Sequence, residues 1–292
     1  MLIENSDEQQ ESRERGPLKP GTINRIVTFM KRVVGSAVDV HGKQLYPYEW
    51  NNHFAKVPVV TTKNTKRPAI LPEIMTGLAR IENIIYRVLF ILLGATGARI
   101  GEILAVEIDK HISPDFRTIS IEQKVYGGVV EARLKTEASW RQVDLHPAIS
   151  ALLRWFVDGR TTGFLFPGAF GDKPISYTCV REHLLRELAA LGYENDYDQS
   201  SDAGTHIFRR FRITYLRNFT GCPTGLRKFW LGHGDGEDED DRDEMGGWYD
   251  RIGLDRPFRL KKAEEFGFGF ELPSDAPNVP KILLRKRRKK GK

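Results

Sequence analysis

Histidine and arginine recur at helical spacing in one short stretch of the chain, THIFRRFRITYLRNF at residues 205–219. His206 and Arg209 are three positions apart, so on a helix their side chains share one face. The apolar residues between the cations indicate that the same helix packs against a core. Because cations gathered this closely favour an anion, the stretch predicts a negatively charged ligand.

A second arginine, Arg99, follows a glycine turn in TGARIGEIL at residues 96–104. Backbone amides and a guanidinium at such a position could together hold a phosphate oxygen. Taken alone, Arg99 is more readily explained as a surface residue paired with Glu102, three positions further on. This alternative stays open on the local pattern.

Five segments resemble, in order and approximate spacing, the motifs of the tyrosine recombinase (phage integrase) family: TGARIGEILAV, LKTEASWRQVDL, THIFRRFR, LGH and WYDRI. The resemblance covers about residues 70–255, with weaker similarity over about 18–60 to part of the family's core-binding domain. It implies a site-specific DNA recombinase, or integrase, that works without a metal, another cofactor or ATP. It places the family's catalytic set on Arg99, Lys135, His206, Arg209, His233 and Tyr249.

The resemblance implies that Tyr249 is the nucleophile, which attacks phosphorus and forms a 3′-phosphotyrosyl intermediate. The transition state of this attack concentrates charge on the non-bridging oxygens. Arg99 and Arg209 are expected to hold those oxygens by charge-assisted, often bidentate hydrogen bonds. Tyr215 is another candidate nucleophile, but its spacing with nearby aromatic residues favours core packing.

Proton transfer is assigned to the remaining members of the set. Lys135 is the expected acid for the leaving oxygen, and an exposed hairpin lysine is the alternative. A phenol with a pKa near 10 needs help to become a nucleophile at neutral pH. His206 is therefore the expected base or tyrosine-positioning group, and His233 the expected donor to a phosphate oxygen.

The expected DNA contacts outside the catalytic set are Arg210, Arg212 and Lys124. For Arg210, Arg212 and Arg217 the helical pattern itself favours a structural role. His233 and Tyr249 are sixteen positions apart, more than is usual in the family, with an acidic stretch at 234–246 between them. That stretch lacks the spacing of an EF-hand, so we expect a solvated loop without a metal.

Charge and composition limit the class of protein. The chain has 292 residues, is 40% hydrophobic and has a net charge of +6. Removing the eight cations of residues 281–292 from that total leaves −2, so the basicity is concentrated in a C-terminal tail. No apolar run approaches the roughly 20 residues of a membrane span, and we expect a cytoplasmic protein. The two cysteines, Cys179 and Cys222, are expected to be reduced packing residues.

The elements that must position these residues are mainly helices. Helical spacing predicts a helix capped by Thr22 and helices within 72–107, then at about 147–158, 176–191, 205–220, 224–231 and 247–265. Alternation in RTISIEQ, VVEARLK and RQVDLH predicts a small antiparallel sheet, with Gly127 and Gly128 turning between the first two strands. The predicted fold is α+β, a tyrosine recombinase-like catalytic domain after a short helical region.

The expected organisation is a flexible leader at 1–18, a partial core-binding region and linker at 19–65, a catalytic domain at 66–272 and a basic tail at 273–292. Expected partners are double-stranded DNA and further copies of the chain, as a tetramer on paired sites or as a monomer or dimer without DNA. The aromatic segment EEFGFGFELP could dock on its own domain or on a neighbour. The alternatives to a recombinase are a catalytically degenerate DNA-binding remnant and a type IB topoisomerase-like enzyme.

Overall fold

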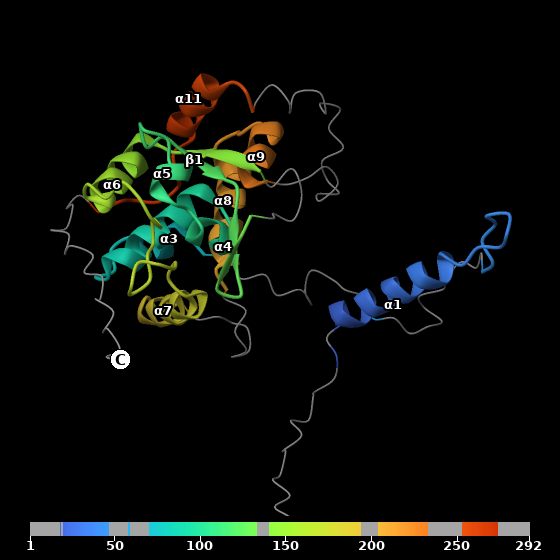
Figure 1. Cartoon of the computed structure of the whole chain (residues 1–292). Helices are drawn as coiled ribbons and strands as arrows, with labels where there is room; N and C mark the ends of the chain where they lie inside the picture. The colour runs from blue at the N-terminus through green and yellow to red at the C-terminus, as the bar shows by residue number, and fades with distance from the viewer. Residues whose placement is uncertain are drawn as a thin grey trace, which may run out of the picture. The chain divides into compact units, whose positions relative to one another are not determined.

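The computed structural model describes residues 18, 20–46, 58, 70–132, 140–193, 204–232 and 253–273. Contacts divide the chain into two units, Met1–Arg67 and Pro68–Lys292, which are described separately. In unit 1, α1 (Pro20–Gly35) is amphipathic and is followed by an antiparallel bridge between Val38 and Gln44 (Figure 1). Because α1 begins at Pro20, Thr22 lies within the helix, and the prediction that it caps the helix is wrong.

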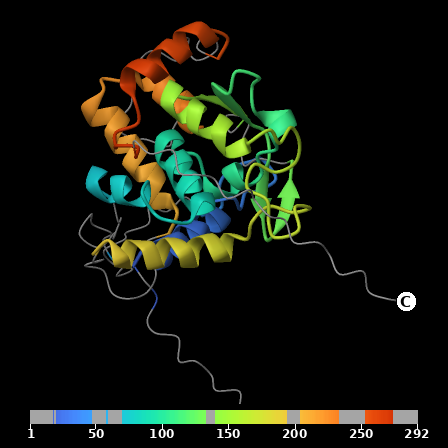
Figure 2. The ribbon, with the colours of Figure 1, turned by 90° about the vertical axis from the view of Figure 1, so that its left-hand side faces the viewer.

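Unit 2 is mainly helical, as the sequence predicted. Its described helices are α2 (Pro72–Leu78), α3 (Ile84–Thr96), α4 (Ile100–Leu104), α5 (Ile108–His111), α6 (Pro147–Val157), α7 (Tyr177–Ala190), α8 (His206–Phe219), α9 (Thr224–Leu231) and α11 (Arg256–Phe266). In two perpendicular views α11 lies at the top of the unit and α7 at the bottom (Figures 1 and 2). Within the described residues, no helix is long and apolar enough to cross a membrane.

The helix α3 lies in the middle of unit 2 and carries the core. Asn83 begins it by accepting a hydrogen bond from the Ile85 amide, and Gly97 ends it in the left-handed conformation with φ of 66°. The sequence predicted one buried stripe, but every residue from Val88 to Thr96 is buried. The ring of Phe90 stacks on Phe208 of α8 with centroids 5.4 Å apart, which joins the central helix to the helix that bears His206 and Arg209.

The strands form two separate two-stranded antiparallel sheets where a single sheet was predicted. β1 (Thr118–Ile121) pairs with β4 (Arg141–Asp144), and β2 (Lys124–Tyr126) pairs with β3 (Val129–Glu131). The turn at Gly127 and Gly128, both with positive φ, therefore joins β2 to β3. The prediction missed β2 because its three residues are too few to show alternation.

The described C-terminal segment packs on its own domain, which is one of the two alternatives left open for it. A second apolar cluster joins α8, α9 and α11, formed by Leu216, Cys222, Leu226, Trp230, Ala263 and Phe266. Beyond α11, Phe268 and Phe270 pack against the main core, with the Phe270 centroid 6.1 Å from Phe211. The Tyr215 hydroxyl donates to the Phe266 carbonyl at 2.9 Å, so this tyrosine packs as the sequence predicted.

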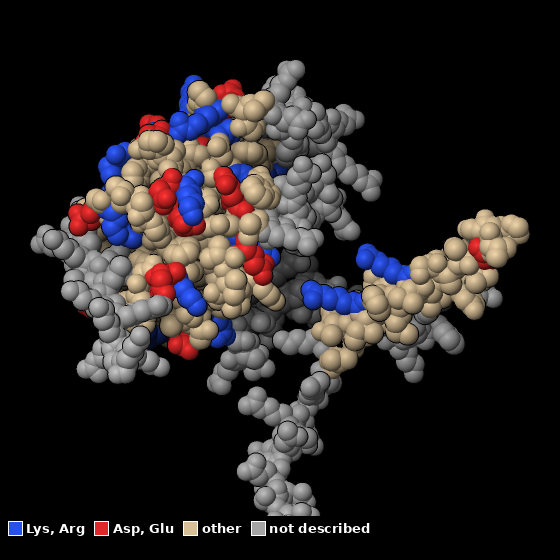
Figure 3. Space-filling model, viewed as in Figure 1, with Lys and Arg blue, Asp and Glu red and all other residues tan. Residues whose placement is uncertain are grey.

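Positive and negative side chains alternate on the face of unit 2 seen in Figure 3. An example is Asp115, which pairs with Arg256 at 2.7 Å while both side chains are substantially exposed. Exposed pairs of this kind contribute about 0–1 kcal/mol. This face therefore offers no continuous area of one charge.

The two cysteines are free and differ in environment. Cys222 is buried, but Cys179 is exposed on α7, so the prediction of two packing residues is wrong for Cys179. Burial raises the pKa of the Cys222 thiol to about 12, so the reactive thiolate scarcely forms at neutral pH. We expect a chromogenic disulfide to titrate Cys179 in native buffer and Cys222 only after denaturation. Rapid labelling of a native Cys179→Ser variant would contradict this result.

Candidate active site

Arg99 stands immediately before α4, where Glu102 holds it in two ways. The backbone amide of Arg99 donates to one carboxylate oxygen of Glu102 at 2.8 Å, and its guanidinium Nη1 donates to the other at 3.0 Å. The side chain of Arg99 is 30% exposed, whereas that of Glu102 is 4% exposed. The buried carboxylate of Glu102 therefore fixes the guanidinium of Arg99, and part of that side chain stays accessible to a ligand.

A second arginine, Arg141 at the start of β4, approaches Glu102 from the buried side. Its Nη2 lies 2.8 Å from Glu102 Oε2, and its side chain has no exposed surface. Its Nε donates to the Trp230 carbonyl of α9 at 2.8 Å. Burial alone would raise the pKa of Glu102, but Arg141 and Arg99 outweigh burial, so that pKa is lowered and the carboxylate stays charged.

Arg209 of α8 bridges the ends of two other elements. Its Nη1 donates to the Gly97 carbonyl at 3.1 Å, and its Nη2 donates to the Leu231 carbonyl at 2.6 Å. Arg209 is buried. Its position ties the turn before Arg99 to the end of α9, at the first residue of the LGH segment. Helix α8 thus brings together two predicted parts of the site that are more than a hundred residues apart.

His206 lies one turn before Arg209 on α8, at the exposed start of the helix. Burial of the ring lowers its pKa, and the positive charges of Arg209, Arg210 and Arg99 lower it further. The hydrogen bond from Arg209 to the Gly97 carbonyl, two positions before Arg99, places the predicted histidine and both predicted arginines in one region. At neutral pH His206 is therefore a neutral imidazole that can accept a proton.

Three glycines permit the close packing of this region. A side chain on Gly97 would meet Leu231 at 2.8 Å, and one on Gly232, which ends α9 with φ of 64°, would meet Arg141 at 2.9 Å. A side chain on Gly101 would meet the Val125 carbonyl at 2.7 Å. The last contact places the β2–β3 hairpin against α4. These approaches explain the glycines of TGARIGE and LGH in physical terms.

The structure thus brings together Arg99, His206 and Arg209. Lys135, His233 and Tyr249 lie outside the described residues, as does the acidic stretch at 234–246, and their roles stay predictions. Among the described residues, no group of three histidine, cysteine, aspartate or glutamate side chains could hold a metal ion.

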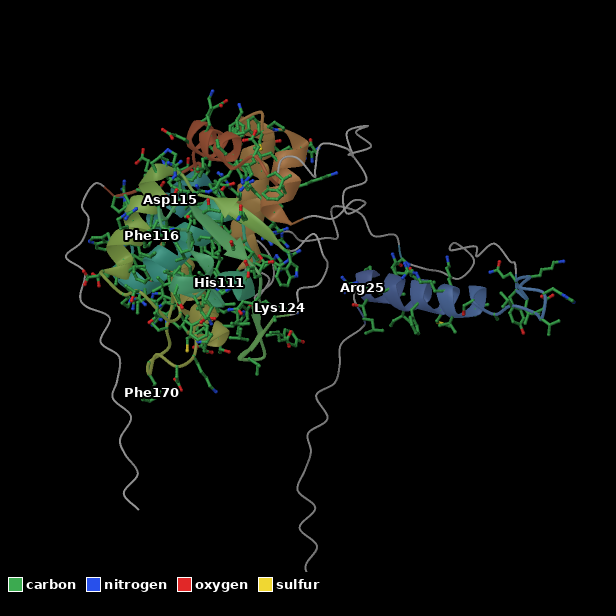
Figure 4. The ribbon with its side chains drawn as sticks, turned by 45° about the horizontal axis from the view of Figure 1, so that its top comes forward. Arg25, His111, Asp115, Phe116, Lys124 and Phe170 are labelled. Carbon is green, nitrogen blue, oxygen red and sulfur yellow. The ribbon has the colours of Figure 1, made fainter. Side chains whose placement is uncertain are left out.

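The predicted DNA contacts have different environments. Arg212 is 4% exposed and donates to the Gly267 carbonyl at 2.8 Å, so the prediction that it contacts DNA is wrong. Burial lowers its pKa to about 10. Arg210 is partly exposed. Lys124 on β2 pairs with Glu131 of β3 at 3.3 Å and lies at one edge of unit 2 (Figure 4). Contacts of Arg210 and Lys124 with DNA stay predictions.

Sequence reasoning missed the supporting role of Arg141. Arg141 and Val143 occupy alternate positions of β4, so they face the same side of the sheet. Because Val143 is in the core, an arginine two positions before it must find a buried anion. The alternation of β4 could therefore have identified Arg141 as a buried arginine that needs an acidic partner.

A search among solved structures finds this fold in the integrase of the transposon Tn1549. One structure, in complex with a circular intermediate DNA, has a TM-score of 0.58 and 16% identity, covering 75% of this chain and 73% of that chain. A complex with transposon right end DNA gives the same four values. A further complex with circular intermediate DNA has a TM-score of 0.57 and 14% identity, covering 82% and 80%.

Neither the family models nor the curated proteins give a match. At these identities the structural likeness concerns the fold, which is that of tyrosine recombinase catalytic domains. The predicted fold class, α+β and mainly helical with antiparallel strands, is confirmed, although the strands form two small sheets where one was predicted.

Proposed function

We propose that this chain is a site-specific DNA recombinase that cleaves and rejoins DNA strands through a 3′-phosphotyrosyl intermediate. The observation that carries the proposal is the convergence of Arg99 and Arg209, which Glu102, Gly97 and Leu231 hold in one region. Two fixed guanidinium groups suit the two non-bridging oxygens of a phosphodiester. Their donors are already oriented, so little reorganisation is needed as charge develops in the transition state.

In this proposal the phenolic oxygen of Tyr249 attacks phosphorus while the phenol proton passes to His206. The bond from phosphorus to the 5′-oxygen breaks, and Lys135 donates a proton to that oxygen, so a 5′-hydroxyl leaves. The new phosphotyrosyl ester replaces the broken bond and retains its energy. Attack by a 5′-hydroxyl of another strand reverses the steps and rejoins DNA without ATP.

Described residues that are close in sequence to His233 and Tyr249 support the roles proposed for those two residues. Leu231, whose carbonyl accepts from Arg209, stands two positions before His233. Gly253, whose carbonyl accepts from Arg259 of α11, stands four positions after Tyr249. Four residues span at most about 14 Å. We therefore propose that His233 donates to a phosphate oxygen and that Tyr249 reaches the phosphate held by the arginines.

The proposed partners are double-stranded DNA and further copies of the chain, with a tetramer on paired DNA sites. The fold shared with an integrase solved on transposon DNA supports the first partner. We propose residues 66–272 as the catalytic domain, residues 19–65 as a partial core-binding region, and the cytoplasm as the place of action.

A nicked suicide duplex tests the function. The duplex would carry a site selected from a random library for retention by this protein, and the nick would let the 5′-hydroxyl fragment diffuse away. The wild type is expected to accumulate covalently on DNA, and Tyr249→Phe to bind equally without an adduct. Binding without an adduct in the wild type would indicate a DNA-binding remnant. Relaxation of a single supercoiled plasmid without joining of two duplexes would indicate a topoisomerase.

The β2–β3 hairpin yields a prediction about affinity. Replacing Lys124 with alanine is expected to weaken binding to random-sequence duplex and to reduce the salt dependence of the association constant by about one counterion. Lys173→Ala is the matched control, because it lies in the 167–174 loop, whose Phe170 is well separated from Lys124 (Figure 4). Fluorescence anisotropy over a range of salt concentrations measures the affinity and its salt dependence for each variant. Equal effects of the two substitutions would contradict a specific role for Lys124.

His206 yields a prediction about pH. Because its pKa is lowered, it takes up a proton only below the ordinary value of 6.5. The rate of adduct formation is therefore expected to be constant above about pH 6.5 and to fall at lower pH as the base is lost. Single-turnover rates between pH 5 and 8 measure this limb, and His206→Gln should remove it. A rate that increases as the pH falls from 7 to 5 would contradict a basic role.

A further inference from the structure

Asp144, at the end of β4, is bonded to both helices that flank residues 233–252. Its Oδ2 accepts from Trp230 Nε1 of α9 at 2.8 Å and from Arg259 Nε of α11 at 2.7 Å. Its Oδ1 accepts from the Thr118 hydroxyl at 3.0 Å. The side chains of Asp144 and Arg259 have no exposed surface. One buried carboxylate thus joins an element before the segment to an element after it.

Arg259 makes further contacts besides its ion pair with Asp144. Its Nη2 donates to Gln142 Oε1 at 2.6 Å, and its Nη1 donates to the Gly253 carbonyl. Its guanidinium also lies over the Phe229 ring of α9, 5.1 Å from the centroid. The same arginine therefore contacts β4, α9 and the chain just before α11. Trp230 is three positions before His233, and Gly253 is four positions after Tyr249.

A buried ion pair is an unusual way to gain stability. Removing two charges from water costs about as much as their attraction returns, and well-packed apolar residues often serve as well. A fully bonded polar network instead specifies one arrangement of the groups that it joins. Here those groups fix the two points from which residues 233–252 start and end.

We propose that Asp144, Trp230 and Arg259 are positioning residues that place the tyrosine-bearing segment against the phosphate site. This inference rests on the proposed function. It assigns a role in the rate of tyrosine attack to residues that touch neither DNA nor the reacting atoms. A displacement of about 1 Å at a reacting group can lower a rate about 100-fold, so a small shift of either end of the segment has a large effect.

The test separates the rate of strand cleavage from DNA affinity. Trp230→Phe removes the bond on the α9 side, and Arg259→Lys weakens the bonds on the α11 side. Each is expected to lower the single-turnover rate of adduct formation about 10-fold, and Asp144→Asn, which affects both sides, about 100-fold. The dissociation constant for the same duplex should change by no more than about 2-fold, because the DNA contacts are intact.

Two controls separate positioning from loss of folding. Asp115→Asn makes the same substitution as Asp144→Asn, but in an exposed aspartate that pairs with Arg256 of α11. It should leave the rate of adduct formation within about 2-fold of the wild type. Leu188→Ala removes a buried side chain of α7, and it should keep the wild-type rate despite a lower Tm. Wild-type rates in all three positioning variants would overturn the inference, as would rates that simply follow Tm across all five. A wild type that forms no adduct would refute the proposed function and this inference with it.

Discussion

Replacing Arg209 with lysine is expected to lower the rate of DNA cleavage about 100- to 1,000-fold while changing DNA affinity little. The guanidinium of Arg209 donates to the Gly97 and Leu231 carbonyls, which fixes the plane of the group between the turn before Arg99 and the end of α9. A lysine ammonium keeps the positive charge but cannot span two carbonyls and a phosphate oxygen. The loss should therefore appear in the transition state, where charge on the oxygens is greatest.

Single-turnover adduct formation at saturating protein measures the effect of Arg209→Lys, with a mobility-shift assay for affinity. Arg217→Lys is the matched control, because Arg217 is on the same helix but exposed. We expect the control to cleave within about 2-fold of the wild type, since it removes no group from the site. Equal rates for Arg209→Lys and the wild type would contradict the assigned role.

Replacing Glu102 with glutamine is expected to lower the free energy of unfolding by about 3 kcal/mol and to reduce cleavage strongly. The carboxylate compensates the buried charge of Arg141 and holds Arg99. A neutral amide has the same volume but leaves Arg141 without its anion. Arg99 also loses the group that orients it, so the defect affects folding and catalysis together.

Urea unfolding of Glu102→Gln and the wild type measures the stability effect. The pKa of Glu102 is lowered in the folded protein, so its stabilisation is complete above the ordinary value of about 4.5 and is lost as the pH falls further. The difference between the two proteins should therefore shrink below about pH 4.5. Glu265→Gln is the control, because Glu265 is exposed in a surface pair with Lys262. A difference that grows on acidification would contradict the proposed ion pair.

The resemblance to the tyrosine recombinase motifs selected Arg99, His206 and Arg209, and helical spacing placed His206 and Arg209 on one face. Local spacing left open whether Arg99 was a site residue or the partner of Glu102. The structure shows that the ion pair exists, and Arg209 ties the turn before Arg99 to the end of α9. The pair with Glu102 is therefore compatible with the proposed role of Arg99 in the site, which local spacing alone could not show.

The supporting contacts could not be predicted in the same way. Arg141 and Glu102 are 39 positions apart, and Arg259 and Asp144 are 115 positions apart, so no local period links them. Arg212 is a related case. The helical pattern favoured a structural role over the predicted DNA contact, but it could not identify the acceptor, which is a carbonyl 55 positions away. Long-range packing decided these cases.

The most direct measurement of the central claim is the identity of the residue that becomes bound to DNA. The wild-type adduct would be trapped on the nicked duplex, digested with nuclease and protease, and analysed by mass spectrometry. The account predicts a nucleotide on the peptide that contains Tyr249, and no such peptide from Arg99→Lys or Arg209→Lys protein in the same time. A nucleotide on any other residue, or an adduct that forms equally fast without either arginine, would contradict it.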